Sequence, residues 1–155
     1  INGTKYPLKN GIGRDGIQKI KEFLRDGGKL ITWGESSKLL NHILDDLKAH
    51  SQEDVIIPGT FINVLFEPDV LTYGIDEEQA VFFTDSITFD CPPHMTLAEM
   101  GSIAAGYASN LTEGNVMVRC DFGKGEVIVY SFLPQYRACV DGSFVLLFNG
   151  LYDYS

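Results

Sequence analysis

The sequence predicts an α/β domain, because helical and extended patterns alternate in the first and last thirds of the chain. Apolar residues recur at helical spacing after Asp15, and Asp26-Gly27-Gly28 ends that segment. A short buried strand, 29–33, follows at once and runs into a tight turn. Near the C-terminus, two extended segments are joined by a Gly-rich turn and followed by a second helical pattern.

The first third is expected to hold two helices around that strand. Residues 1–14 are rich in Gly, Asn and Lys, which predicts a loop or the remnant of a longer chain. Asp15 is expected to cap the first helix, and a second helix is expected directly after the turn at 34–37. The apolar stripe predicted for the second helix is Leu39, Leu40, Ile43, Leu44 and Leu47.

The middle of the chain is richer in strand signals. Strands are expected at 61–66, 80–83 and 86–89, whereas the Ala/Gly-rich residues 97–108 favour no single structure. A hairpin is expected at 116–132 and a final helix after residue 142. The apolar face predicted for that helix is Phe144, Leu147, Phe148 and Leu151. No repeat or linker interrupts the pattern, so residues 1–155 are expected to form a single domain.

Composition excludes several classes of function. Of 155 residues, 45% are hydrophobic and 21% charged, which is typical of a globular domain with a sizeable core. Twelve basic against twenty-one acidic residues give a net charge of −9, which argues against nucleic acid and anionic membranes as partners. No apolar run approaches the roughly 18 residues that a membrane span requires. We also find no signal-peptide pattern.

No cofactor or metal site is expected from the motifs. Cys91, Cys120 and Cys139 lack zinc spacing and are interpreted as buried or idle thiols, with one disulfide left open for a secreted parent protein. His50-Ser51-Gln52-Glu53 matches HxxE, but catalytic zinc needs a third protein ligand. Residues 11–16 fit GxGxxG, but no strand precedes them, so a dinucleotide site is not expected.

Ser36 is the most informative position for chemistry. It lies where a strand turns sharply into a helix, which presents a side chain at the carboxyl edge of a sheet. A nucleophile there also needs a base within hydrogen-bond reach, and His42, His50 and His94 are poorly placed to supply one. The alternative role for Ser36 is to cap the helix that follows.

The order Gly27-Gly28-x-Leu-Ile followed by Gly34-x-Ser36 resembles the class I glutamine amidotransferase-like fold. That family carries a nucleophilic cysteine in the turn, where this chain has Ser36. A late strand of the family leads into Phe-His-Pro-Glu, where this chain has Leu133 and Gln135 in place of the histidine and glutamate. The resemblance implies a three-layer, flavodoxin-like sheet with an added hairpin region. It also implies a pseudoenzyme, because an alkyl group and an amide cannot replace the lost acid–base groups.

A narrower resemblance is carried by residues 23–28, 123–128, 134–138 and 142–149. Together they look like the amidotransferase-like domain at the C-terminus of bacterial zinc-carboxypeptidase-like proteins. The resemblance implies a non-catalytic accessory domain of a larger metallocarboxypeptidase-like protein, partnered with the peptidase-like domain upstream in the same parent chain. It also implies a periplasmic or extracellular location. The family's initial β-α-β stretch is missing or reduced here, so we expect a truncated sheet whose open edge favours a homodimer.

Three functional hypotheses remain open at this point. In the first, the accessory domain packs against its parent enzyme or binds part of its substrate through strand-end loops. The residues expected in those loops are Glu35, Ser36, Tyr73, Pro134, Tyr136 and Arg137. The second hypothesis is a degenerate hydrolase that uses Ser36. The third is a stand-alone small-ligand or sugar-binding module in the same cleft.

Overall fold

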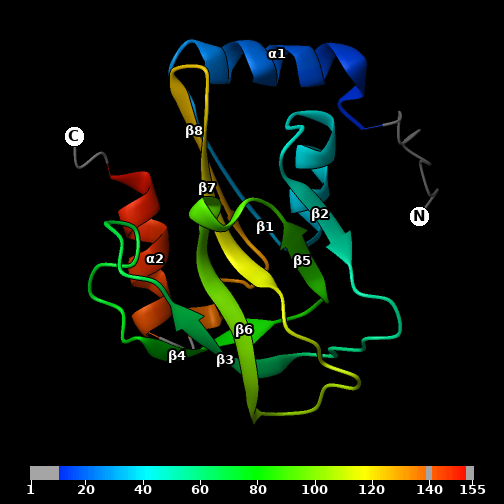
Figure 1. Ribbon diagram of the computed structural model, residues 1–155, viewed down its shortest axis with the longest axis vertical. Coiled ribbons are helices and arrows are strands. Elements are labelled where there is room, and N and C mark those ends of the chain that lie inside the picture. The colour runs from blue at the N-terminus through cyan, green and yellow to red at the C-terminus, as the bar shows by residue number, and fades with distance from the viewer. Residues whose placement is uncertain (1–10, 139–140, 153–155) are drawn as a thin grey trace, which may run out of the picture.

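The computed structural model describes residues 11–138 and 141–152 (Figure 1). Residues 1–10, most of the segment predicted as a loop, lie outside the described part. In chain order the elements are α1 (Gly13–Arg25), β1 (Lys29–Trp33), the 3₁₀ helix η1 (Gly34–His42), β2 (Lys48–Ser51), β3 (Thr60–Phe66), β4 (Glu78–Phe83), β5 (Ile87–Asp90), the 3₁₀ helix η2 (Pro93–Met95), β6 (Thr96–Ala105), β7 (Asn115–Phe122), β8 (Gly125–Tyr130), the 3₁₀ turn η3 (Tyr136–Ala138) and α2 (Asp141–Leu151).

The strands form one mixed, curled sheet of eight strands. Six of them follow the order β1-β8-β7-β6-β3-β4, while β2 pairs with β5 and β5 joins the side of β7. Among the described strands, only β1 and β8 pair in parallel, and the other pairs are antiparallel. The α/β class predicted from the sequence is confirmed in this form, an open curled sheet with few helices (Figure 1).

Helix α1 begins two residues before the predicted cap. Ile12 occupies the N-cap position and Asp15 lies in the first turn, where a carboxylate offsets the positive end of the helix dipole. The helix ends as predicted, because Gly27 adopts a φ of +105° and the Gly28 amide donates to the Phe23 carbonyl at 2.8 Å. The Leu24 side chain is fully buried beneath the helix.

The second α-helix predicted from the apolar stripe is wrong. A 3₁₀ helix, η1, ends at His42, and strand β2 follows at Lys48. The Asn41 side chain explains the change, since it donates to the Ala49 carbonyl and accepts from the Ala49 amide, both at 2.7 Å. These bonds replace the ladder of a continuing helix. Leu40, Ile43, Leu44 and Leu47 are nevertheless buried.

Three predicted strand regions in the middle of the chain are confirmed as β3, β4 and β5. The ambiguous residues 97–108 form most of β6, which pairs with both β3 and β7. At Gly101, a Cβ atom would come within 2.8 Å of the Asn63 carbonyl oxygen, so a side chain is excluded there. Small residues therefore mark a close approach of two strands rather than a break.

The predicted hairpin is confirmed as β7 and β8. Gly123 turns it with a φ of +67°, and a Cβ atom at this position would lie 2.7 Å from the Arg25 Cα atom. The Arg25 guanidinium lies 5.5 Å from the centre of the Phe122 ring. The hairpin turn is therefore packed against the C-terminal end of α1.

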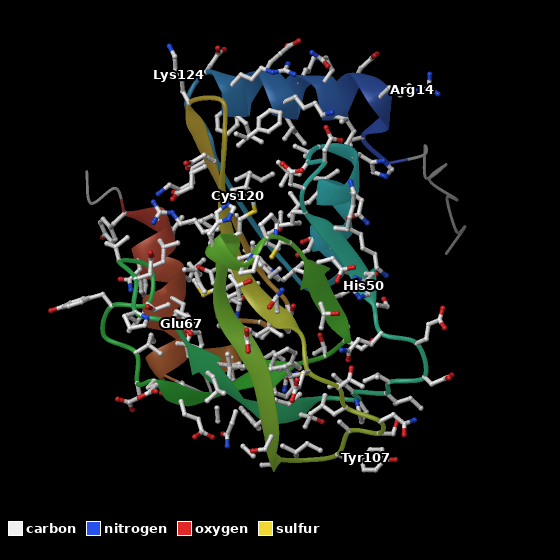
Figure 2. The ribbon with its side chains drawn as sticks, viewed as in Figure 1. Arg14, His50, Glu67, Tyr107, Cys120 and Lys124 are labelled. Carbon is white, nitrogen blue, oxygen red and sulfur yellow. The ribbon has the colours of Figure 1, made fainter. Side chains whose placement is uncertain are left out.

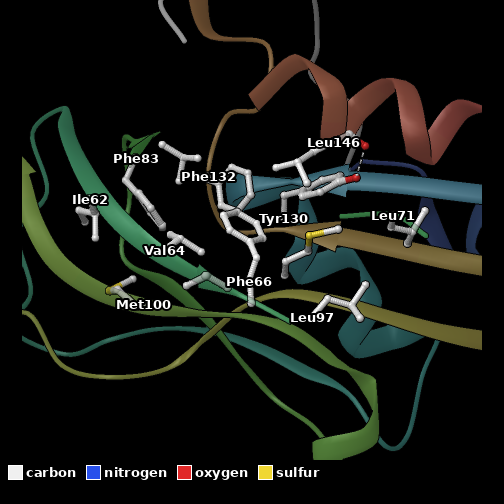
Figure 3. Close-up of a cluster of buried hydrophobic side chains, with 14 of the residues drawn as sticks. Ile62, Val64, Phe66, Leu71, Phe83, Leu97, Met100, Tyr130, Phe132 and Leu146 are labelled. Atoms are coloured by element: carbon white, nitrogen blue, oxygen red, sulfur yellow. Dashed lines mark hydrogen bonds between the residues drawn. The ribbon is translucent and has the colours of Figure 1, made fainter. Parts of the chain in front are cut away.

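Two hydrophobic clusters form the core, one on each side of the β1–β8–β7 strands. The larger cluster gathers side chains from β3, β4, β6 and β8 with Phe132 and Leu146 (Figure 3). The smaller one lies under α1 and η1 and includes Leu24, Leu40 and Phe89. At roughly 25 cal/mol per Å² of apolar area, such burial is the main stabilising term of a domain of this size.

The apolar face predicted for α2 does not point into the core. Phe148 is 51% and Leu151 60% exposed, whereas Asn149 and Leu146 are buried. Polar contacts explain the orientation. The Tyr130 hydroxyl donates to the Leu146 carbonyl at 2.9 Å, and the Asn149 side chain donates to two carbonyls of the 67–77 connection. These bonds direct the other side of the helix inward.

Candidate functional site

Strands β1 and β8 bring the candidate site residues to one edge of the sheet. The two strands are parallel, with Trp33 opposite Tyr130 at their carboxyl ends. The connections 34–37 and 131–137 therefore leave the same edge. Open α/β sheets place ligands at this edge.

Gly34 makes the sharp turn after β1. Its φ is +53°, a left-handed conformation that glycine adopts without strain. A Cβ atom at this position would lie 2.9 Å from the Asp85 Oδ2 atom. The turn thus requires glycine for two reasons, backbone angle and space.

Ser36 is exposed, but its hydroxyl is engaged with the backbone. Ser36 Oγ donates to the Trp33 carbonyl at 2.6 Å and accepts from the Trp33 amide at 3.3 Å. Within the described part of the chain, none of its hydrogen bonds involves a histidine or a carboxylate. The arrangement caps the end of β1 and supplies no base for a nucleophile.

A pair of carboxylates lies beside the turn. Glu35 bonds with Lys38 Nζ at 2.8 and 2.9 Å, and Ser51 lies within 3.5 Å of the same carboxylate. Burial raises the pKa of Asp85 above its usual range, with a smaller contribution from the charge of Glu35. Asp85 is not among the residues predicted from the sequence, because nothing in the strand pattern around it signals a contact with a turn 51 residues earlier.

The second connection holds the positions aligned with the family's histidine and glutamate. The Leu133 amide donates to the Phe82 carbonyl at 2.9 Å, which fixes the connection against β4. Gln135 Oε1 is buried and has no hydrogen-bond partner within the described residues. Neither side chain has a group that takes up a proton at neutral pH.

Tyr136 and Arg137 form a stack with β4. The Tyr136 ring lies 3.9 Å from the Phe82 ring centre at an interplanar angle of 15°. The guanidinium carbon of Arg137 lies 5.3 Å from the centre of the Tyr136 ring. Arg137 adopts a φ of +46°, so its backbone is strained to hold this position.

Pro134 and Tyr73 have different surroundings. Pro134 is buried, and its carbonyl accepts a hydrogen bond from Ser143 Oγ at 2.7 Å. Tyr73 is 78% exposed in the 67–77 connection, and its carbonyl accepts from Asn149. It lines a hollow of about 620 Å³ with several acidic residues, whereas Ser36 and Arg137 do not line that hollow.

His50, Cys91 and Cys120 lie outside the two connections that leave this edge. His50 lies in β2 rather than at a helix end, with Nε2 3.2 Å from Thr88 Oγ1 and Nδ1 3.6 Å from Asp90 (Figure 2). Within residues 11–138 and 141–152, no group of three or more His, Cys, Asp or Glu side chains is placed to hold a metal. Cys91 and Cys120 are free thiols, and burial raises the pKa of Cys120 to about 11. Cys139 lies outside the described residues. None of the described helices has the length and hydrophobicity of a membrane span.

Comparison with known proteins finds similarity of fold. No family model and no curated protein matches the chain. A β-galactosidase from Bacillus circulans sp. alkalophilus is similar with a TM-score of 0.57 and 16% identity, over 88% of this chain and 20% of that chain. A cytoplasmic protein from Salmonella typhimurium LT2 is similar with a TM-score of 0.52 and 14% identity, over 84% of this chain and 57% of that chain. A β-galactosidase from Rahnella sp. R3 is similar with a TM-score of 0.52 and 15% identity, over 89% of this chain and 21% of that chain. The chain thus spans about a fifth of these β-galactosidases and shares their fold over that part.

Proposed function

We propose that this chain is a non-catalytic, amidotransferase-like accessory domain of a larger enzyme. The hydroxyl of Ser36 carries this proposal, because it donates to the Trp33 carbonyl and makes no hydrogen bond with a base among the described residues. Leu133 and Gln135 supply no acid–base group at the two other positions of the family's catalytic set. The domain acts through binding and packing rather than bond cleavage.

The proposed relation to the amidotransferase-like fold has support in the β1–β8 unit. Two parallel strands end in a tight turn and in a second connection at one edge. Helices pack on both faces of this unit: α2 contacts Tyr130, while α1 and η1 cover the opposite cluster. We interpret this as the remaining part of a three-layer, flavodoxin-like arrangement, truncated before β1.

The parent enzyme is proposed from two independent likenesses. Sequence motifs resemble the domain that follows zinc-carboxypeptidase-like domains, which would place the protein in the periplasm or outside the cell. The fold also occurs within β-galactosidase chains about five times as long as the part that matches. This second likeness favours a glycoside-cleaving parent as the alternative. The proposed role of this chain as an accessory domain is the same with either parent enzyme.

The contact with the parent domain is proposed at the strand-end edge. Arg137 and Tyr136 contact each other there, and Glu35 lies at the neighbouring turn. Arg and Tyr are favoured anchors of protein interfaces. Binding of a sugar by stacking on Tyr136 is less favoured, because Phe82 covers one ring face and the Arg137 guanidinium also contacts the ring.

Reading the full coding sequence around this chain is the first test. An in-frame domain with HxxE and a later histidine ligand supports the carboxypeptidase-like parent, and a glycosidase domain supports the alternative. An open reading frame limited to this domain contradicts the accessory role.

Replacement of Arg137 tests the contact itself. We expect Arg137→Ala to weaken binding between this domain and the separately produced remainder of the parent about tenfold or more, measured by calorimetry. Lys124→Ala, in the hairpin turn beside α1, is the matched control and should leave the affinity unchanged. An Arg137→Ala affinity equal to that of the wild type refutes the proposed contact.

A further inference from the structure

Strand β1 lies at the end of the sheet and has β8 as its only strand partner within the described residues. In parallel pairing, alternate residues of a strand bond to the neighbouring strand. The Gly28 carbonyl accepts from the Glu126 amide at 3.1 Å, which directs the even-numbered residues of β1 toward β8. The odd-numbered residues therefore direct their amides and carbonyls to the open side.

Ser36 closes one of these open positions. Its hydroxyl bonds both the amide and the carbonyl of Trp33. No backbone hydrogen bond to another described element occupies Lys29 or Ile31 on this side. Two donors and two acceptors are thus presented along a short edge, which is the pattern that accepts one more strand.

Helix α2 presents an apolar stripe beside this edge. Phe144, Leu147, Phe148 and Leu151 follow the spacing i, i+3, i+4, i+7, which is typical of a helix-packing face. Phe148 and Leu151 are 51% and 60% exposed, and no charged residue occurs from 142 to 152. A helix that is apolar on its outer side is normally covered in the assembled protein.

The contacts of α2 show on which side the stripe lies. A Cβ atom at Gly150 would contact Ile31 and the Tyr130 hydroxyl, so this side of the helix faces β1 and β8. Val145 and Asn149 face the 67–77 connection, which reaches β7 through the Asp69–Arg119 ion pair. Leu147 and Leu151 are on the opposite side by helical geometry. The stripe therefore lies beyond β1, next to its open edge.

We propose that a second copy of this chain covers this surface, with β1 paired antiparallel to β1 of that copy. A two-fold axis at Leu30 sets Lys29 of each copy opposite Ile31 of the other, which uses all four open backbone groups. Trp33, already bonded by Ser36, stays outside the pairing. The same axis places both α2 helices on one face of the joined sheet, stripe against stripe.

Charge does not oppose a second copy at this surface. The chain carries a net charge of −9, so two copies repel each other over most of their surface. The proposed surface is an exception: its helix stripe is uncharged, and Lys29 forms an ion pair with Glu126 at 3.0 Å within its own chain. Because donors, acceptors and apolar residues all match under one two-fold axis, the surface is complementary to itself.

Sedimentation equilibrium of the whole chain over a range of concentrations tests the proposal. We expect a mass of twice 17.2 kDa for the wild type. The double variant Phe148→Lys/Leu151→Lys should raise the dimer dissociation constant at least about 100-fold. Ile56→Lys, which replaces a residue of 61% exposure outside this surface, is the matched control and should remain dimeric. A monomeric wild type, or a dimer that survives the double variant, overturns the proposal.

Hydrogen exchange tests the β1 pairing separately. We expect the Lys29 and Ile31 amides to be protected at high protein concentration and to exchange rapidly after dilution. The Thr32 amide, which faces β8, should be protected at both concentrations. Exchange of Lys29 and Ile31 that does not depend on concentration overturns the strand pairing, even if α2 joins the copies. Both experiments use this chain alone, so their outcomes do not depend on the accessory role or on a parent domain.

Discussion

Single side chains decide the character of the strand-end site. The sequence pattern indicates two alternative roles for Ser36, nucleophile and helix cap. The hydrogen bonds of its hydroxyl with Trp33 favour a cap, although the capped group is the end of a strand rather than the first turn of an α-helix. Asp85 could not be predicted from the sequence, because its close approach to Gly34 joins segments 51 positions apart. No local pattern encodes such a contact.

Replacement of Ser36 should reduce stability modestly. We expect Ser36→Ala to lower the free energy of unfolding by about 0.5–1 kcal/mol, because the open groups of Trp33 lose their partner but remain accessible to water. Urea unfolding measures the change. Ser51→Ala removes only a 3.5 Å contact with Glu35 and serves as the control, with an effect within about 0.5 kcal/mol.

Asp85 should make stability depend on pH. Burial raises its pKa in the folded state, so the folded protein holds this proton at a pH where the unfolded chain, with a pKa of about 4, has lost it. The stabilising contribution is complete below the unfolded pKa and is lost as the pH rises through the folded value. Asp85→Asn removes this dependence. The free energy of unfolding of the variant, relative to that of the wild type, should therefore increase as the pH rises through this range. Parallel curves of unfolding free energy against pH for the two proteins would contradict the expected pKa shift.

Elements differ in how well local patterns predict them. Helix α1, strand β1 and the β7–β8 hairpin were predicted, because their periodicity and glycine turns agree with the surrounding packing. The second helix was not, since Asn41 bonds the backbone of Ala49 and strand β2 replaces the end of the helix. The apolar stripe of α2 was recognised, but periodicity alone does not say which side of a helix meets the core. Polar anchors decide that direction here.

The anchoring of α2 gives a prediction for this element. Tyr130→Phe removes the buried hydroxyl that donates to the Leu146 carbonyl, and we expect a loss of about 1–2 kcal/mol in the free energy of unfolding. Amide hydrogen exchange in α2 should also be faster in Tyr130→Phe than in the wild type. Tyr107→Phe changes a residue of 62% exposure and should be silent in both measurements. Equal effects of the two variants would show that the hydroxyl does not anchor the helix.

At the scale of the whole molecule, the α/β class could be predicted, whereas the sheet topology could not. The sequence shows where strands begin and end, but the pairings of β6 with β3 and of β5 with β7 join distant segments. Within the described residues, the curled sheet leaves β1 with one strand partner. The same unit brings Ser36, Leu133 and Gln135 to one edge, and none of these three side chains supplies an acid–base group at neutral pH. The proposal that follows is that this edge binds and packs rather than catalyses.

Covalent labelling of the intact chain tests this conclusion most directly. The wild type and Ser36→Ala are incubated with a fluorophosphonate probe beside an active serine hydrolase, and intact masses are measured. We predict no mass increase for either form under conditions that modify the control completely, because the Ser36 hydroxyl bonds the Trp33 backbone and no base among the described residues. A stoichiometric adduct on the wild type that is absent from Ser36→Ala would show an activated nucleophile and contradict the non-catalytic role.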